Sequence, residues 1–88
     1  MERNKNTPMY NKRVWLNDSK SPSTGSIVCY YGPDIWDPGK VSMFIEISSC
    51  SSVARLHQAG TESKEKFIKK VVKMRDELNA FIEFMVNK

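Results

Sequence analysis

The sequence is short of the residues that most catalytic and metal sites use. Its 88 residues include one histidine, two cysteines and four glycines. A turn is expected between Cys50 and His57, so the two side chains lie too far apart to act together as a catalytic Cys–His pair. No second Cys or His lies at metal-ligand spacing from either cysteine. No glycine pattern that cradles a phosphate occurs. We therefore expect a protein without catalysis, without a metal site and without a cofactor.

Long apolar runs are also missing. No stretch approaches the ~20 apolar residues of a membrane span, and the first residues contain no apolar run of signal-peptide length. Cys29 and Cys50 are too few and too unpatterned for a disulfide scaffold. These absences predict a cytoplasmic protein with reduced thiols and no membrane partner.

The positive charge gathers at the two ends of the chain. The net charge is +4; residues 1–23 hold five basic and two acidic side chains, and residues 61–88 hold seven and five. An acidic partner such as nucleic acid would meet these ends first. A charge of this size also serves solubility alone, and composition does not choose between the two.

Four segments have the patterns of β-strands. Residues 12–17 alternate between polar and apolar, residues 26–31 are rich in β-formers, residues 40–48 alternate most clearly, and residues 53–58 follow a serine-rich turn. Residues 1–11 are polar and lack periodicity, which predicts a flexible basic arm. We predict an α+β fold: a four-stranded antiparallel β-meander packed against one long C-terminal α-helix, as a single β-β-β-β-α domain over residues 12–88.

The C-terminal segment has a helical stripe. Thr61 is the expected N-cap, and apolar residues recur at spacings of four and three from Phe67 to Met85. A helix of about 25 residues is ~37 Å long, which exceeds what short strands cover. The apolar end must be covered either by a second copy of the helix or by the N-terminal arm folding back. For the homodimer, the expected interface is Leu78, Phe81, Ile82 and Met85.

One face of the expected sheet carries rings among cations. If the aliphatic residues of each strand face the helix, alternation places on the opposite face Arg13, Trp15, Tyr30, Phe44, Arg55 and His57. Aromatic rings among cations suit unpaired bases and phosphates. The alternative is ordinary cross-strand packing or a second small core. The binding alternative predicts a single-stranded nucleic-acid surface.

A tryptophan lies in the middle of a turn-rich loop. Gly32-Pro33-Asp34 and Asp37-Pro38-Gly39 are turn formers on either side of Ile35 and Trp36. An indole there either folds back on a core or meets a partner. We expect a protein-binding loop formed by Asp34, Ile35, Trp36 and Asp37, since rigid aromatic residues are common interface hot spots.

The order of four antiparallel strands and one long helix, with its strand-to-helix transition over residues 53–82, resembles the single-stranded-DNA-binding transcriptional coactivator family. The resemblance covers residues 12–88 in element order and implies a sheet that faces nucleic acid and helices that join two subunits. No motif is matched residue by residue, so no site residue is taken from it. The small chain is also similar in style to phage-encoded accessory proteins, which implies the host cytoplasm.

Two hypotheses follow. The first is a non-catalytic protein that binds single-stranded nucleic acid on the exposed sheet face. The second is a phage-type inhibitor or adaptor that binds a host defence protein through the Trp36 loop. A dimer that sequesters a small ligand between its subunits is a further alternative.

Overall fold

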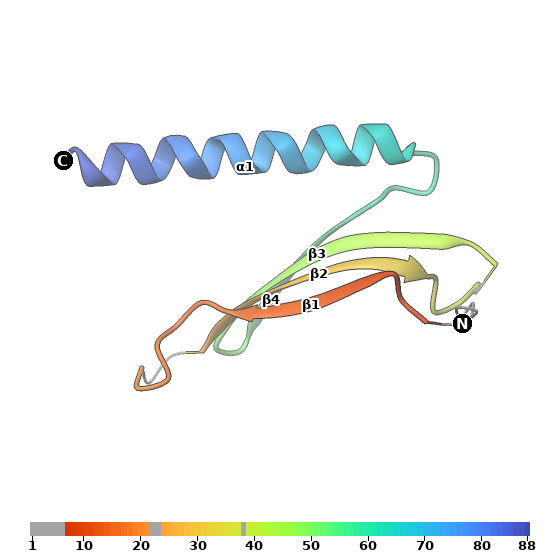
Figure 1. The fold of residues 1–88 in the computed structure, drawn as a ribbon, viewed down its shortest axis with the longest axis horizontal. Coiled ribbons are helices and arrows are strands. Elements are labelled where there is room, and N and C mark those ends of the chain that lie inside the picture. The colour runs from red at the N-terminus through yellow and green to blue at the C-terminus, as the bar shows by residue number, and fades with distance from the viewer. Residues whose placement is uncertain (1–6, 22–23, 38) are drawn as a thin grey trace. The chain divides into compact units, whose positions relative to one another are not determined.

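The computed structural model describes residues 7–21, 24–37 and 39–88. The chain forms two compact units, Met1–His57 and Gln58–Lys88. The first unit holds all the strands and the second holds the helix (Figure 1). The α+β class predicted from the sequence is confirmed.

The first unit is an open antiparallel sheet in which neighbours in sequence are neighbours in space. Its strands are β1 (Tyr10–Trp15), β2 (Gly25–Pro33), β3 (Val41–Ser49) and β4 (Ser52–His57), in the order β1-β2-β3-β4 (Figure 1). The β3–β4 turn contains Cys50 with φ 53°, a left-handed conformation that a tight turn uses. The predicted meander is therefore present, with each strand within two residues of its expected start.

The strand pairing divides the side chains into two faces. On the aliphatic face, Val14 pairs with Ile27, which pairs with Ile47, and Cys29 pairs with Ile45. On the other face, Val28 pairs with Glu46. Met43 and Ile45 are buried on the aliphatic face and Val28 on the other. Buried residues therefore occur on both faces of the sheet.

The N-terminal end of the sheet is fixed by a close backbone approach. The backbone N–H of Met9 donates to the Tyr31 carbonyl oxygen at 2.9 Å. A Cβ placed on Gly32 would lie 2.7 Å from the Cα of Pro8, so only glycine leaves room for the chain there. Strand β1 begins at Tyr10, inside the segment expected as an arm. Residues 1–6 of that arm lie outside the described residues.

The second unit is the helix α1 (Lys64–Val86) and the turn before it. The predicted N-cap Thr61 is wrong, because Ser63 is the cap and its hydroxyl accepts from the Lys66 backbone N–H at 3.2 Å. Glu62 is held in the preceding turn: its backbone N–H donates to the Ala59 carbonyl at 2.9 Å. The helix therefore begins two residues later than a Thr61 cap would place it.

Glu62 has a second role through its carboxylate. Its Oε1 accepts from the Ala59 backbone N–H at 3.2 Å and lies 2.9 Å from Lys70 Nζ. The hydrogen bond from Lys70, aided by the bond from Ala59 and the positive charges of Lys70 and Lys66, holds the pKa of Glu62 below its ordinary value. The carboxylate thus ties the turn to the second turn of the helix.

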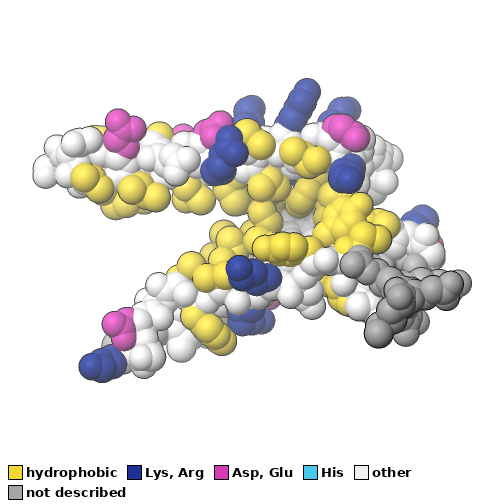
Figure 2. Space-filling view, viewed as in Figure 1, with side chains coloured by type: hydrophobic (Ala, Val, Ile, Leu, Met, Phe, Trp, Pro, Cys, Tyr) yellow, Lys and Arg dark blue, Asp and Glu magenta, His cyan; other side chains and the backbone are white. Residues whose placement is uncertain are grey.

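Apolar side chains run along one side of the helix, and charged ones lie on the opposite side (Figure 2). Every residue from Arg75 to Lys88 is exposed. The predicted dimer residues Leu78, Phe81, Ile82 and Met85 are each at least half exposed. In the described part of the chain, no helix is apolar enough over its length to cross a membrane.

Candidate nucleic-acid interface

The six side chains predicted to share a face do share it. The register pairs Arg13 with Val28, Val28 with Glu46 and Glu46 with Arg55 in one row. The next row holds Tyr30, Phe44 and His57. Trp15, opposite Ser26, belongs to the row on the other side. We call this surface the aromatic face; its members are Arg13, Trp15, Tyr30, Phe44, Arg55 and His57.

Three side chains of the aromatic face form a continuous stack across strands β2, β3 and β4. The Tyr30 and Phe44 rings are stacked, with centroids 4.9 Å apart and planes 10° apart. The Arg55 guanidinium carbon lies 4.1 Å from the Phe44 centroid. Tyr30 comes from one neighbouring strand and Arg55 from the other, so they cover opposite sides of the Phe44 ring. Phe44 therefore offers an edge, and not a free ring face, to a ligand.

The Tyr30 ring is anchored at its outer end. Its hydroxyl donates to the Pro33 carbonyl oxygen at 2.6 Å, which fixes the ring against the end of β2. The Tyr30–Phe44–Arg55 stack thus forms a floor in which the two rings are half-buried and Arg55 is exposed. The cross-strand packing considered from the sequence is correct for Tyr30 and Phe44, because neighbouring strands bring facing aromatic residues within contact.

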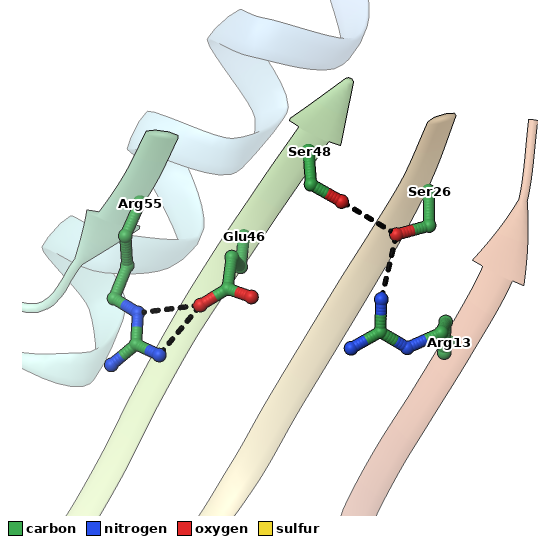
Figure 3. A network of polar contacts seen from close by, with 5 residues as sticks. All are labelled: Arg13, Ser26, Glu46, Ser48 and Arg55. Carbon is green, nitrogen blue, oxygen red and sulfur yellow. Dashed lines mark hydrogen bonds and ion pairs between the residues drawn. The ribbon is translucent and has the colours of Figure 1, made fainter. Parts of the chain in front are cut away.

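The arginines of the aromatic face have unlike partners (Figure 3). Arg55 donates to one carboxylate oxygen of Glu46 from Nε at 3.1 Å and from Nη2 at 2.6 Å. Arg13 donates from Nη1 to the Ser26 hydroxyl at 2.7 Å, and that hydroxyl shares a hydrogen bond of 2.8 Å with Ser48 Oγ. Ser26 is 1% exposed. A carboxylate thus neutralises Arg55, whereas the uncharged hydroxyl of Ser26 holds Arg13.

This difference decides which cation can attract an anion. The charges of Arg55 and Glu46 cancel at contact distance, so a phosphate gains little there. Arg13 keeps its full charge, and its guanidinium lies 5.4 Å from the Trp15 ring centroid. A guanidinium held by a neutral partner next to an aromatic ring can bind a phosphate while a base stacks on the ring.

Trp15 has the most exposed Trp, Tyr or Phe side chain within the strands. It is 64% exposed and borders a hollow of about 300 Å³ formed with the residues of the β1–β2 loop and the start of β2, which include Asn17, Asp18 and Thr24. Trp15 therefore lies on the surface and not in the interior, so its ring is accessible to a ligand.

The Trp36 loop is ordered by one aspartate. Asp34 Oδ1 accepts from the backbone N–H groups of Trp36 and Asp37 at 2.8 and 3.1 Å. The backbone N–H of Asp34 donates to the Lys40 carbonyl at 3.0 Å and closes the loop. Trp36 itself is 93% exposed. The loop backbone is thus held by Asp34, and the indole lies exposed and does not fold back on the sheet.

The Trp36 loop and the aromatic face border a common groove, which we call the tryptophan groove. It has a volume of about 450 Å³ and is lined by Tyr30, Pro33, Asp34, Ile35, Trp36, Ser42, Phe44, Arg55 and His57. Pockets of about 300–1,000 Å³ are typical of small-ligand sites. The aromatic face and the Trp36 loop, which were separate candidate sites in the sequence analysis, therefore meet at this groove.

Sequence reasoning missed the residues that hold the arginines. Ser26, Glu46 and Ser48 are on the aromatic face, but alternation reveals only the face and not which neighbour a long side chain will contact. The available signal was the opposite charge of Glu46 beside Arg55 on an antiparallel neighbour. No comparable signal marks Ser26.

No group of three or more His, Cys, Asp or Glu residues that could hold a metal ion occurs among the described residues. Comparison with known proteins gives no further guide to the site. No family model, no curated protein and no solved structure matches the chain.

Proposed function

We propose that the chain is a non-catalytic protein that binds single-stranded nucleic acid on the aromatic face. One observation carries the proposal: the strand register places exposed Trp15 beside Arg13, whose charge has no acidic partner among the described residues. Ring stacking suits bases of any sequence, and a nearby cation suits the phosphate that joins them. The net charge of +4 favours the same class of partner.

The residues have separate roles in this proposal. Trp15 stacks on a base, which is worth about 1–3 kcal/mol by alanine substitution. Arg13 binds a phosphate. The Tyr30–Phe44–Arg55 stack is a floor along which the strand runs, with edge contacts at Phe44 and a polar contact at His57. Arg3 and Lys5 of the N-terminal arm lie outside the described residues, so they contribute to this proposal only through their positive charge.

A titration with a fluorescently labelled oligothymidylate tests the proposal. We expect an anisotropy increase at low salt, and an affinity about 5- to 150-fold weaker for Trp15→Ala, which corresponds to about 1–3 kcal/mol. Val53→Ala is the matched control, because Val53 is in the row of Trp15, is 62% exposed and has no ring. Equal affinities for the two variants, or no anisotropy change for the native chain, would contradict the proposal.

A second candidate is a protein-binding inhibitor or adaptor, such as a phage protein that acts on a host defence protein. It is favoured by the preorganised loop, where Asp34 holds the backbone while Trp36 remains 93% exposed. A rigid exposed aromatic side chain loses little entropy on binding and often dominates an interface. The test is a pull-down from a host lysate followed by mass measurement of the complex. Trp36→Ala should abolish the complex and Ile35→Ala should weaken it less.

The helix supports a proposal about assembly. Leu78, Phe81 and Met85 follow one another at spacings of three and four, Ile82 is the next residue after Phe81, and all four are at least half exposed. Burial of such side chains stabilises by about 1.5–3 kcal/mol each. A second copy of the same helix is the simplest partner, because two-fold homodimers are the commonest assembly. We propose that the chain forms a homodimer through this stripe.

A further inference from the structure

The two exposed tryptophans mark opposite ends of the first unit. Trp15 is opposite Ser26, at the start of β2, and the tryptophan groove begins between Tyr30 and Pro33, at the end of the same strand. Tyr30 is four residues and Pro33 seven residues after Ser26. At ~3.3 Å per residue, the path from Trp15 to the groove is about 13–23 Å along the sheet.

The groove end is suited to a planar, uncharged ring. Trp36 is 93% exposed and lines the groove together with Phe44 and the anchored Tyr30 ring. The Arg55–Glu46 pair near the floor has no net charge, and the Asp34 carboxylate adds a negative one. A phosphate is therefore disfavoured in this groove, whereas a base can stack on the indole and donate from an amino or imino group toward Asp34.

The Trp15 end has the complementary character. Arg13 supplies an uncompensated positive charge and is held in place by the buried Ser26 hydroxyl, which also shares a hydrogen bond with Ser48. The phosphate-binding and base-binding features are thus distributed along one face. A linear anionic polymer with planar groups at intervals matches this pattern better than a compact ligand does.

We infer that Trp15 and Trp36 bind two separated bases of one nucleic-acid strand, with a phosphate at Arg13 and the intervening nucleotides lying over the Tyr30–Phe44–Arg55 stack. This inference rests on the proposed nucleic-acid binding and adds the length of its ligand. A strand that keeps the ~3.4 Å rise of a stacked strand spans the path with about four to seven nucleotides. That length falls within the ~4–16 nucleotides bound by comparable single-strand sites.

The protein's tryptophan content gives a direct test, because Trp15 and Trp36 are its two tryptophans. In Trp15→Phe only Trp36 fluoresces, and in Trp36→Phe only Trp15 does, while phenylalanine preserves a ring at the changed position. Each variant is titrated with labelled oligothymidylates of about two, four, eight and twelve nucleotides, lengths that bracket the about four to seven nucleotides expected for the path. Anisotropy reports binding and tryptophan quenching reports which end is occupied.

We expect the longest oligomer to quench both tryptophans at one stoichiometric point. Affinity should rise steeply between two and about eight nucleotides, because joining two sites makes the second contact intramolecular. Trp36→Ala should remove most of that rise, and Val41→Ala should retain it, because Val41 is 44% exposed and does not line the groove. For the native chain, a joined second site corresponds to at least about a 10-fold gain in affinity.

The alternative results are distinguishable. Anisotropy that rises while Trp36 remains unquenched, or an affinity that does not depend on length beyond two nucleotides, refutes the two-ended site and leaves nucleic-acid binding at Trp15 intact. Absence of any anisotropy change refutes both. In that event Trp36 and its groove are better explained by a protein partner.

Discussion

The two arginines of the aromatic face should separate stability from nucleic-acid binding when each is replaced by alanine. Arg55 is bonded to Glu46 through two nitrogen atoms and covers the Phe44 ring at 4.1 Å. Arg13 is bonded to a hydroxyl and lies beside exposed Trp15. We expect Arg55→Ala to lower stability more than Arg13→Ala, and Arg13→Ala to lower nucleic-acid affinity more than Arg55→Ala.

The stability term follows from the two Arg55 contacts. The ion pair is partly exposed, with the Arg55 side chain at 48% and Glu46 at 21%, so it contributes about 0.2–1 kcal/mol. A cation over an aromatic ring near the surface adds about 0.5–1 kcal/mol. Arg55→Ala should therefore destabilise by about 1–2 kcal/mol. For a domain of this size, each kcal/mol corresponds to a Tm change of about 4–8 °C.

The contribution of each arginine to nucleic-acid affinity is measured from the salt dependence of binding. Removing a cation that contacts phosphate lowers the slope of log affinity against log salt by about one, and removing a neutralised cation leaves that slope unchanged. The assay is oligothymidylate binding over a salt series for both variants, with thermal unfolding of each alone. A loss of slope for Arg55→Ala with none for Arg13→Ala would falsify the assignment of phosphate binding to Arg13.

Three further perturbations test other parts of the molecule. Gly32→Ala should destabilise by about 1–3 kcal/mol in urea unfolding, because the new methyl group would lie 2.7 Å from the Pro8 Cα. Glu62→Gln should lower stability at neutral pH, because the hydrogen bond from Lys70 favours the Glu62 carboxylate. The stability difference between the native chain and this variant should disappear as the pH falls from 4.5, the ordinary pKa of the group, through its lower pKa in the folded state. Phe81→Glu should turn a concentration-dependent mass into that of a monomer, measured by sedimentation.

Each of these has a matched control. Gly25→Ala should cost less than Gly32→Ala, because its methyl group would meet the end of the Asn17 side chain, which can turn away. Lys70→Met should likewise remove the pH dependence of stability that Glu62 causes. If that pH dependence is retained in Lys70→Met, Lys70 is not its cause. Phe81→Leu should keep the mass of the assembly, and a native chain that is monomeric at all concentrations refutes the homodimer.

The sequence predicted what depends on periodicity. Two-residue alternation located the strands and placed Arg13, Trp15, Tyr30 and Phe44 on one face, because the pleat leaves each side chain only two directions. Turn-forming residues likewise located the loop around Trp36. These features are local, so they can be derived without knowledge of the partner strand.

Alternation did not predict what each side chain contacts. Phe44 was expected to offer its ring to a base, yet Tyr30 and Arg55 cover both sides of it. That outcome depends on the register between three strands, which the strand patterns alone do not determine. The Thr61 cap was wrong for a similar reason, since the turn held by Glu62 competes with the helix start.

The strand order leaves β1 and β4 each with one neighbour in the sheet. Their outer rows of backbone N–H and C=O groups are templates for another extended chain, and natural proteins commonly guard such borders with lysine or arginine. Lys12 and Arg13 lie in the middle of β1 and point to opposite sides of the sheet, whereas β4 has a single cation, Arg55, already bonded to Glu46. We therefore expect unwanted strand addition, where it occurs on ageing or at high concentration, to begin along β4.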